Sequence, residues 1–188
     1  MQTYSYDGKV LTLYSKVGVD HYCIDYALKK EEFNQPVVIS EGVEDCSYMF
    51  SSCSSFNQPV VIPKSVNSCD RMFWDCKSFN LPVIIPDGVK DCYEMFYGCS
   101  NFNQPITIPD SVTRCEGMFC NCTSFNQKVD LPGRIVDCSS LFYGCVSFNQ
   151  HITIPDNVTD CSNMFGGCTS FNQPVRVGLA VKNCTFNT

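Results

Sequence analysis

The chain has 188 residues and a net charge of −6, with 17% charged and 44% hydrophobic residues. No segment approaches the roughly 18 consecutive apolar residues that a membrane span requires. The acidic balance and the lack of a basic run argue against direct nucleic-acid binding. The first residues show neither the basic nor the apolar region of a secretory signal, so we expect a cytoplasmic protein without membrane contact.

The N-terminal segment, residues 1–32, does not share the pattern of the remaining chain. Residues 3–14 alternate in polarity around Asp7-Gly8, which predicts a β-hairpin. Residues 19–30 carry apolar side chains near helical spacing and predict a helix. We therefore expect residues 1–32 to cap the open end of the core that follows.

From residue 33 to residue 188, one unit of 23 residues recurs six times and begins a seventh. Its signatures are Phe-Asn-Gln-Pro at the start and Met-Phe-x-x-Cys near the end. The units begin at Phe33, Phe56, Phe79, Phe102, Phe125, Phe148 and Phe171. A constant period without insertions predicts a solenoid of stacked coils, with six full repeats and one truncated repeat.

Each unit predicts one strand and one helical turn, when positions are counted from its first Phe. Positions 5 and 7 are apolar in every copy and predict a short parallel strand, which Pro at positions 4 and 8 confines. After a turn, apolar residues at positions 14, 17, 18 and 21 predict a short helix or 3₁₀ turn. Asp at position 13 of several copies suits an N-cap. The predicted fold class is an α/β repeat solenoid.

Two further columns have an expected structural role. Thirteen of the fourteen Phe residues stand at positions 1 and 18 and are expected to fill the core. Asn stands at position 2 in all seven copies, and Gln follows it in six. We expect an Asn side-chain ladder that satisfies backbone groups at a bend, with a binding role as the alternative.

Thirteen of the fifteen Cys residues stand at positions 14 and 21. Along a helix these positions lie about 10 Å apart, and down a column the spacing of about 4.8 Å exceeds the Cβ separation of about 3.8 Å that a disulfide prefers. We interpret them as buried, reduced thiols. With no Cys-x-x-Cys pair and only His21 and His151, neither a metal site nor a cofactor is expected. Cys120 lies outside both columns and is expected to be an exposed thiol.

Outward positions that vary between units are the candidate binding residues. Position 6 faces away from the core on the strand side. Its residues are Val38, Val61, Ile84, Thr107, Asp130, Thr153 and Arg176. The row of apolar residues suggests an interface, although β-propensity would also explain it.

The second candidate surface is the outer ridge of the predicted helical turn. It carries aromatic and acidic residues, with Trp74 as the best candidate for a hot spot. The ridge residues are Trp74, Tyr97, Tyr93, Tyr48, Tyr143, Asp70, Asp75, Glu94 and Glu116. Such a mixture suits a basic protein partner, and the alternative is that the aromatics only cover neighbouring coils.

The C-terminal end is less well covered than the N-terminal end. After Val181 only Cys184 and Phe186 remain to cover the last coil. We therefore expect that two chains pair through this end as a homodimer.

The repeats resemble a known family. The segment from Ile152, Ile-Thr-Ile-Pro-Asp-Asn-Val-Thr, and the segment 164–174, Met-Phe-Gly-Gly-Cys-Thr-Ser-Phe-Asn-Gln-Pro, resemble BspA-type leucine-rich repeats. The resemblance covers residues 33–188. It implies a right-handed coil like that of leucine-rich-repeat proteins, no catalytic residues, and a protein-binding role, often at a bacterial surface.

The favoured function is thus a non-enzymatic protein-binding module. One concrete version is a phage or bacterial protein that binds and inhibits a basic, nucleic-acid-processing host protein in the host cytoplasm. The alternative is a bacterial cell-surface adhesin or a virion component. An enzyme would need a polar cluster that the repeats do not provide.

Overall fold

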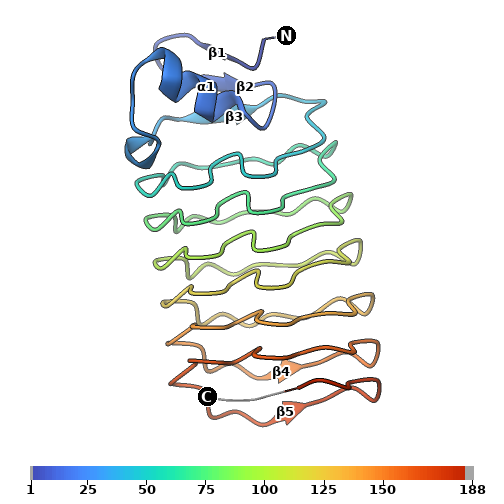
Figure 1. Cartoon of the computed structure of the whole chain (residues 1–188). Coiled ribbons are helices and arrows are strands. Elements are labelled where there is room, and N and C mark those ends of the chain that lie inside the picture. Colours follow the sequence, from blue (N-terminus) through green and yellow to red (C-terminus); the bar gives the residue numbers. More distant parts are fainter. Residues whose placement is uncertain (1, 185–188) are drawn as a thin grey trace.

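Residues 2–184 are described in this computed structural model, in which one coil per repeat stacks on the next to form an elongated solenoid (Figure 1). The N-terminal end carries β1 (Tyr4–Tyr6), β2 (Leu11–Leu13), α1 (Gly18–Asp25) and the 3₁₀ turn η1 (Lys30–Glu32). The coils contribute β3 (Val37–Ile39), β4 (Ile152–Thr153) and β5 (Val175–Arg176).

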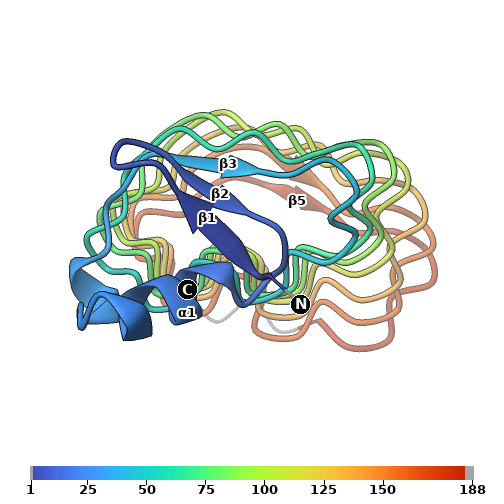
Figure 2. The same cartoon turned by 90° about the horizontal axis from the view of Figure 1, so that it is seen from above.

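The N-terminal segment forms a layer across the first coil. β1 and β2 form the expected antiparallel hairpin. β2 also pairs in parallel with β3, so residues 11–13 add one strand in front of the strand of the first repeat. Seen from above, α1 lies on the opposite side of the layer from these strands (Figure 2). Tyr22 of α1 is 3% exposed and meets the ring of Phe33 edge-on at 5.9 Å. The helix is shorter than predicted, because Ala27 adopts a left-handed φ of 51°.

The strand predicted for every unit is present only near the two ends. β3 pairs with β2, and β4 pairs with β5. In the coils between, the segments 60–62, 83–85, 106–108 and 129–131 keep the alternation of buried and exposed side chains but form no strand. Proline at position 8 of these four units, and at position 4 of three of them, withholds an N–H from any ladder there.

The prediction of a helical turn in each unit is wrong. The structure has α1 and η1 in residues 1–32, and no helix in the described part of residues 33–188. In the coil that begins at Phe56, backbone hydrogen bonds of 3.1 and 3.0 Å close two successive turns, 69–72 and 73–76. Their third residues, Arg71 and Asp75, have φ of 50° and 59°. A positive φ at the third residue alone identifies type II turns, and it breaks a right-handed helix.

The same two left-handed positions recur in every full repeat. At position 16 they are Tyr48, Arg71, Glu94, Gly117, Ser140 and Asn163, and at position 20 they are Ser52, Asp75, Gly98, Asn121, Gly144 and Gly167. Asp at position 13 caps this turn segment instead of a helix. The N–H of Ser162, for example, donates to Asp160 Oδ1 at 2.8 Å and holds the pKa of that carboxyl below its usual value.

The hydrogen-bonded ladder between coils runs through these turns. The N–H groups of Cys69, Arg71, Phe73 and Asp75 donate to carbonyls of the next coil over 2.7–2.9 Å. Most of the equivalent bonds, at positions 14, 16, 18 and 20, recur between the other described coils. Each turn therefore presents its N–H groups along the solenoid axis, and this side of the solenoid, instead of the predicted strands, holds the coils together.

Phe rings fill the core in two columns, as predicted. Phe96 is fully buried. Its ring stacks on that of Phe102, six residues later in the chain, with a centroid distance of 4.3 Å, and on that of Phe73 in the preceding coil at 5.5 Å. Along position 1, successive rings from Phe56 to Phe148 are 5.9–6.2 Å apart. Phe148 and Phe171, beside the paired strands β4 and β5, are also 5.9 Å apart, so the ring column keeps one spacing whether or not the strands pair.

The Asn ladder is confirmed along its whole length. Asn57 donates its backbone N–H to the side-chain oxygen of Asn34 at 2.9 Å, and each later Asn repeats this bond over 2.9–3.0 Å. The Gln side chain of the next coil adds a bond to the same oxygen, except that Leu81 makes none to Asn57. The column is thus explained by backbone satisfaction.

Fourteen of the fifteen Cys residues are buried and Cys184 is half-buried, but two of our expectations for them are wrong. Cys161 and Cys184 form a disulfide with a Cα–Cα distance of 4.7 Å, although we expected all column thiols to be reduced. The structure brings these Cα atoms within the range that a bridge accepts. Cys120, expected to be exposed, is 6% exposed, and burial raises the pKa of its thiol to about 12. At position 21 the thiols also donate hydrogen bonds, such as Cys99 to the carbonyl of Phe73 at 3.0 Å.

At the C-terminal end the last described coil is less well covered. Phe171, Val175 and Val181 occupy core columns but are only half-buried, and Val177 is 39% exposed. Phe186, which we expected to help cover this coil, lies outside the described residues. Pairing of two chains through this end stays a prediction.

Candidate protein-binding surfaces

Two surfaces carry the candidate residues. The strand face is formed by position 6 and the turn that follows it. The ridge is formed by positions 13–20 on the hydrogen-bonded side. The two differ in what their side chains already contact within the chain.

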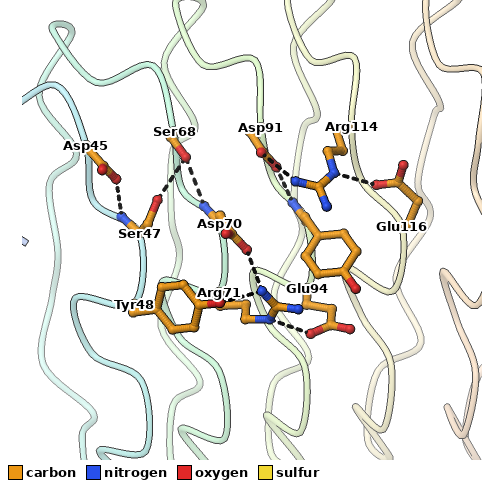
Figure 3. A network of polar contacts seen from close by, with 11 residues as sticks. Asp45, Ser47, Tyr48, Ser68, Asp70, Arg71, Asp91, Glu94, Arg114 and Glu116 are labelled. Atoms are coloured by element: carbon orange, nitrogen blue, oxygen red, sulfur yellow. Dashed lines mark hydrogen bonds and ion pairs between the residues drawn. The ribbon is translucent and has the colours of Figure 1, made fainter.

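On the ridge, arginines and tyrosines stack across coils (Figure 3). The Arg71 guanidinium lies between two rings, 5.4 Å from the centroid of Tyr48 and 4.4 Å from that of Tyr93. The Arg114 guanidinium also lies over the Tyr93 ring, 4.1 Å from its centroid. Since an arginine and its tyrosine partners come from neighbouring coils, this stack stabilises the solenoid by cation–π attraction.

The same arginines are paired with carboxylates. Arg71 Nε donates to Glu94 Oε2 at 2.7 Å, and Arg114 Nη1 donates to Asp91 Oδ2 at 3.0 Å. In addition, each arginine lies 3.5 Å from a second carboxylate, Arg71 from Asp70 and Arg114 from Glu116. Two guanidinium groups thus serve four carboxylates, and the network keeps a negative balance.

Two of these carboxylates are poorly satisfied. Asp70 Oδ1 and Glu116 Oε2 are buried and accept no hydrogen bond, although each lies near an arginine. Burial raises the pKa of both carboxyl groups. Desolvation therefore outweighs the attraction of the arginines at these two positions.

The remaining ridge aromatics mostly cover their neighbours. Trp74 is half-buried, and its ring stacks on Tyr97 with a centroid distance of 5.5 Å and an interplanar angle of 10°. Asp75, at the next position, holds one of the left-handed turns. Tyr143 is 45% exposed and lies beyond Cys120 on the same column. The structure thus assembles most of the predicted ridge residues, but mainly by contacts between coils.

The strand face leaves its apolar side chains uncovered. Val61 and Ile84 are 82% and 84% exposed and Val38 is 52% exposed, whereas position 5 and position 7 of these units are mostly buried. Thr107 and Asp130 continue the row as exposed residues. Three consecutive coils therefore carry an exposed β-branched side chain, and such rows are uncommon on surfaces that face only water.

Two hollows flank Ile84. The first, of about 630 Å³, lies between the coils that begin at Phe56 and Phe79. Its walls are mainly apolar, with Pro59, Val61 and Pro82 beside Ile84. The second, of about 690 Å³, extends from Ile84 to the coil that begins at Phe125.

The second hollow is acidic. It contains Asp87, Asp110 and Asp130 and one cation, Lys128. Lys128 pairs with Asp130 at 2.9 Å, and among residues 2–184 no cation pairs with Asp87 or Asp110. We did not predict these two residues. The sequence does show an acidic residue at position 9 in four of the seven units. Position 9 lies in the turn after the predicted strand, and we assigned that turn only a structural role.

The backbone on this face is also unpaired. In the extended segments 60–62, 83–85, 106–108 and 129–131, no N–H or C=O group forms a hydrogen bond within the described chain. At the ends of the solenoid, in contrast, Ser40 N–H donates to Leu13 O and Ile154 N–H to Arg176 O. The middle coils thus combine exposed position-6 side chains with extended segments that form no backbone ladder.

Two absences hold for the described residues. No group of three or more His, Cys, Asp or Glu residues in 2–184 is placed to hold a metal ion. Over the same range, no helix has the length and apolarity needed to cross a bilayer.

Two family models match the chain. Residues 92–175 match the BspA type leucine-rich-repeat region, and residues 26–107 match a family described as a Mycoplasma protein of unknown function, DUF285. Among the curated proteins no match to the chain is found.

Solved structures share the fold. A leucine-rich repeat protein from Bacteroides ovatus is similar with a TM-score of 0.64 and 25% identity, over 77% of this chain and 38% of that one. A leucine rich cell surface protein from Faecalibacterium prausnitzii has a TM-score of 0.64 at 22% identity, over 93% and 46%. The T. pallidum leucine-rich repeat protein has 0.56 at 15%, over 90% and 87%. The chain thus spans less than half the length of the first two.

Proposed function

We propose that this chain, whose repeats belong to the BspA-type leucine-rich-repeat family, is a non-enzymatic module that binds a protein through its strand face. The observation that carries the proposal is the row of Val38, Val61 and Ile84, exposed on three consecutive coils beside an apolar hollow. Burying one such side chain against a partner contributes roughly 1.5–3 kcal/mol. Three adjacent side chains of this kind would form the apolar centre of an interface.

The ridge is the weaker candidate, because its best binding groups are already engaged. Arg71 and Arg114 stack on tyrosines and pair with carboxylates, and Trp74 stacks on Tyr97. A partner would have to separate these groups before it could use them. The strand face needs no such rearrangement.

We further propose that the module acts at a bacterial surface. The resemblance to BspA-type repeats supports this location better than the cytoplasmic one expected from the N-terminal residues, and one structural neighbour is itself described as a cell surface protein. The partner would then be a host or matrix protein.

Affinity capture tests the binding face. Immobilised protein is exposed to extracellular-matrix extracts and to bacterial lysates, and captured proteins are identified by mass spectrometry. A partner that binds the strand face is retained by the wild type and by Trp74→Ala but lost with Val61→Asp. Val136→Asp is the matched control, since Val136 is 51% exposed and lines neither hollow. A partner lost with Trp74→Ala but kept by Val61→Asp would refute the strand face.

The acidic ridge favours a second candidate, a phage or bacterial protein that inhibits a basic nucleic-acid-processing enzyme. Its support is the excess of carboxylates over arginines in the network of Figure 3 and the net charge of −6. Such a complex would weaken steeply between low and high salt. Capture of basic enzymes that is absent, or that does not change with salt, would count against this candidate.

A further inference from the structure

The strand face changes in character along the solenoid, and this gradient describes its partner. The N-terminal half, with Val38, Val61 and Ile84, is apolar, and the following coils present Thr107 and then Asp130 at the same position. Asp87 and Asp110 add carboxylates without an ion-pair partner within residues 2–184. A complementary partner is therefore apolar at one end and basic at the other.

The spacing of the coils matches that of an extended chain laid along the solenoid axis. Position-1 rings of the middle coils are 5.9–6.2 Å apart. In an extended chain, side chains on one face recur every two residues, about 6.6–6.8 Å. One partner side chain can therefore meet each coil over a stretch of several coils.

Contact on the strand face is made by side chains. The residues on either side of the exposed row are closed to a partner, since Val60, Ile62, Val83 and Ile85 are only 5–6% exposed. An extended peptide presents every second side chain to the face on which it lies, so the hollows beside Ile84 can give specificity one side chain at a time.

We propose that the strand face binds an extended peptide segment with two apolar residues two positions apart, followed four positions later by Lys or Arg. The first apolar side chain lies between Val38 and Val61, and the second enters the hollow between Val61 and Ile84. The basic side chain pairs with Asp110, which lies near Asp130 and its partner Lys128. The steps from Phe79 to Phe102 and from Phe102 to Phe125, 6.1 and 5.9 Å, place these carboxylates about 12 Å beyond the second apolar site. Four residues of extended chain span about 13 Å.

This inference rests on the proposed use of the strand face and adds the chemistry of the partner. The probe is a fluorescein-labelled peptide of nine residues, with valine, leucine and lysine at its second, fourth and eighth places among serines and threonines. Its binding is measured by fluorescence anisotropy. The control peptides replace the lysine with glutamate, or move it next to the leucine.

We expect the first peptide to bind and both control peptides to bind more weakly. Ile84→Asp weakens the first peptide at least about tenfold, because an apolar contact of roughly 1.5 kcal/mol or more is lost. Asp110→Lys weakens it about threefold to fivefold, as for a solvent-exposed ion pair, and restores binding of the glutamate peptide. The matched controls are Val136→Asp and Asp156→Lys, which alter exposed residues outside both hollows.

Selection from a library of random twelve-residue peptides separates the two proposals. Enriched peptides that carry the apolar–basic pattern and lose binding with Ile84→Asp support both. Enriched peptides without the pattern that still lose binding with Ile84→Asp refute the peptide class and keep the strand face as the binding surface. Enrichment unaffected by Ile84→Asp refutes both. No enrichment, together with no binding of the designed peptide, refutes the extended-peptide inference, and the capture experiment then decides on the strand face alone.

Discussion

Removal of one central Phe ring should cost far more stability than removal of a terminal one. Phe96 is fully buried and lies in the middle coil of the stack. Its ring meets four others, with centroid distances of 4.3, 5.5, 5.9 and 6.4 Å to Phe102, Phe73, Phe119 and Phe79. Phe171 is only half-buried and meets two rings, at 4.2 and 5.9 Å.

The magnitude follows from burial and from the cavity. Phe96→Ala removes a ring from a site closed on both sides by hydrogen-bonded coils, so little collapse can fill the space. A cost of about 3–5 kcal/mol is expected, which is a large part of the stability of a small domain. Phe171→Ala leaves a site that water and neighbouring side chains can reach. About 1–2 kcal/mol is expected there, from partial burial alone.

Urea denaturation measures both values. Trp74 fluorescence reports on the middle coils, and far-ultraviolet circular dichroism reports on the whole chain. Coincident transitions with an unchanged slope allow the free energies of unfolding to be compared directly. A cost for Phe96→Ala no larger than that for Phe171→Ala would refute the central position of the stacked rings in the energetics.

Three further outcomes are expected. Asn80→Ala should lower the free energy of unfolding more than Asn57→Ala, by about 0.5–1 kcal/mol in urea denaturation. The Asn80 side-chain oxygen accepts two hydrogen bonds from the next coil, whereas that of Asn57 accepts one, so equal costs would contradict the ladder. Glu116→Gln should raise the melting temperature at pH 7. Burial raises the pKa of the folded carboxyl above its unfolded value, so ionised Glu116 destabilises the folded state at neutral pH. The advantage of Gln should shrink as the pH falls through the folded pKa and vanish below the unfolded pKa of about 4.3. The thirteen free thiols should resist a thiol reagent at pH 8 in the native protein, since they are buried and burial raises the pKa of thiols such as Cys120. In denaturant, thirteen thiols should react without reductant and fifteen after reduction; fifteen without reductant would contradict the Cys161–Cys184 disulfide.

The helical turn illustrates where the sequence pattern was ambiguous. Apolar residues at positions 14, 17, 18 and 21 match one face of a helix, but two successive type II turns place the same positions inward. The left-handed residues decide between them, and at position 16 they include Tyr48, Arg71 and Glu94, which carry no local preference for that conformation. These backbones are held by hydrogen bonds to the next coil, a contact that a single unit does not contain.

The candidate site was also only partly readable. Position 6 was predicted to face outward, and Val61 and Ile84 do so. The sequence did not show that the ridge tyrosines contact arginines of neighbouring coils. Arg71 stacks on Tyr48 of the preceding coil and on Tyr93 of the following one, and these contacts exist only once the coils are stacked. The carboxylates of Asp87 and Asp110 were missed because the relation of their turn to the hollow depends on how coils pack side by side.

The constant period of the repeat by itself determined the solenoid, the Phe core and the Asn ladder, because a column repeated without insertion must meet itself in the next coil. Only the tertiary structure decided which side of the coil carries the hydrogen bonds. The turns present their N–H groups along the axis, while proline withholds N–H groups from a ladder on the strand side. The middle coils of the strand face consequently lack a backbone ladder, and their position-6 side chains are exposed.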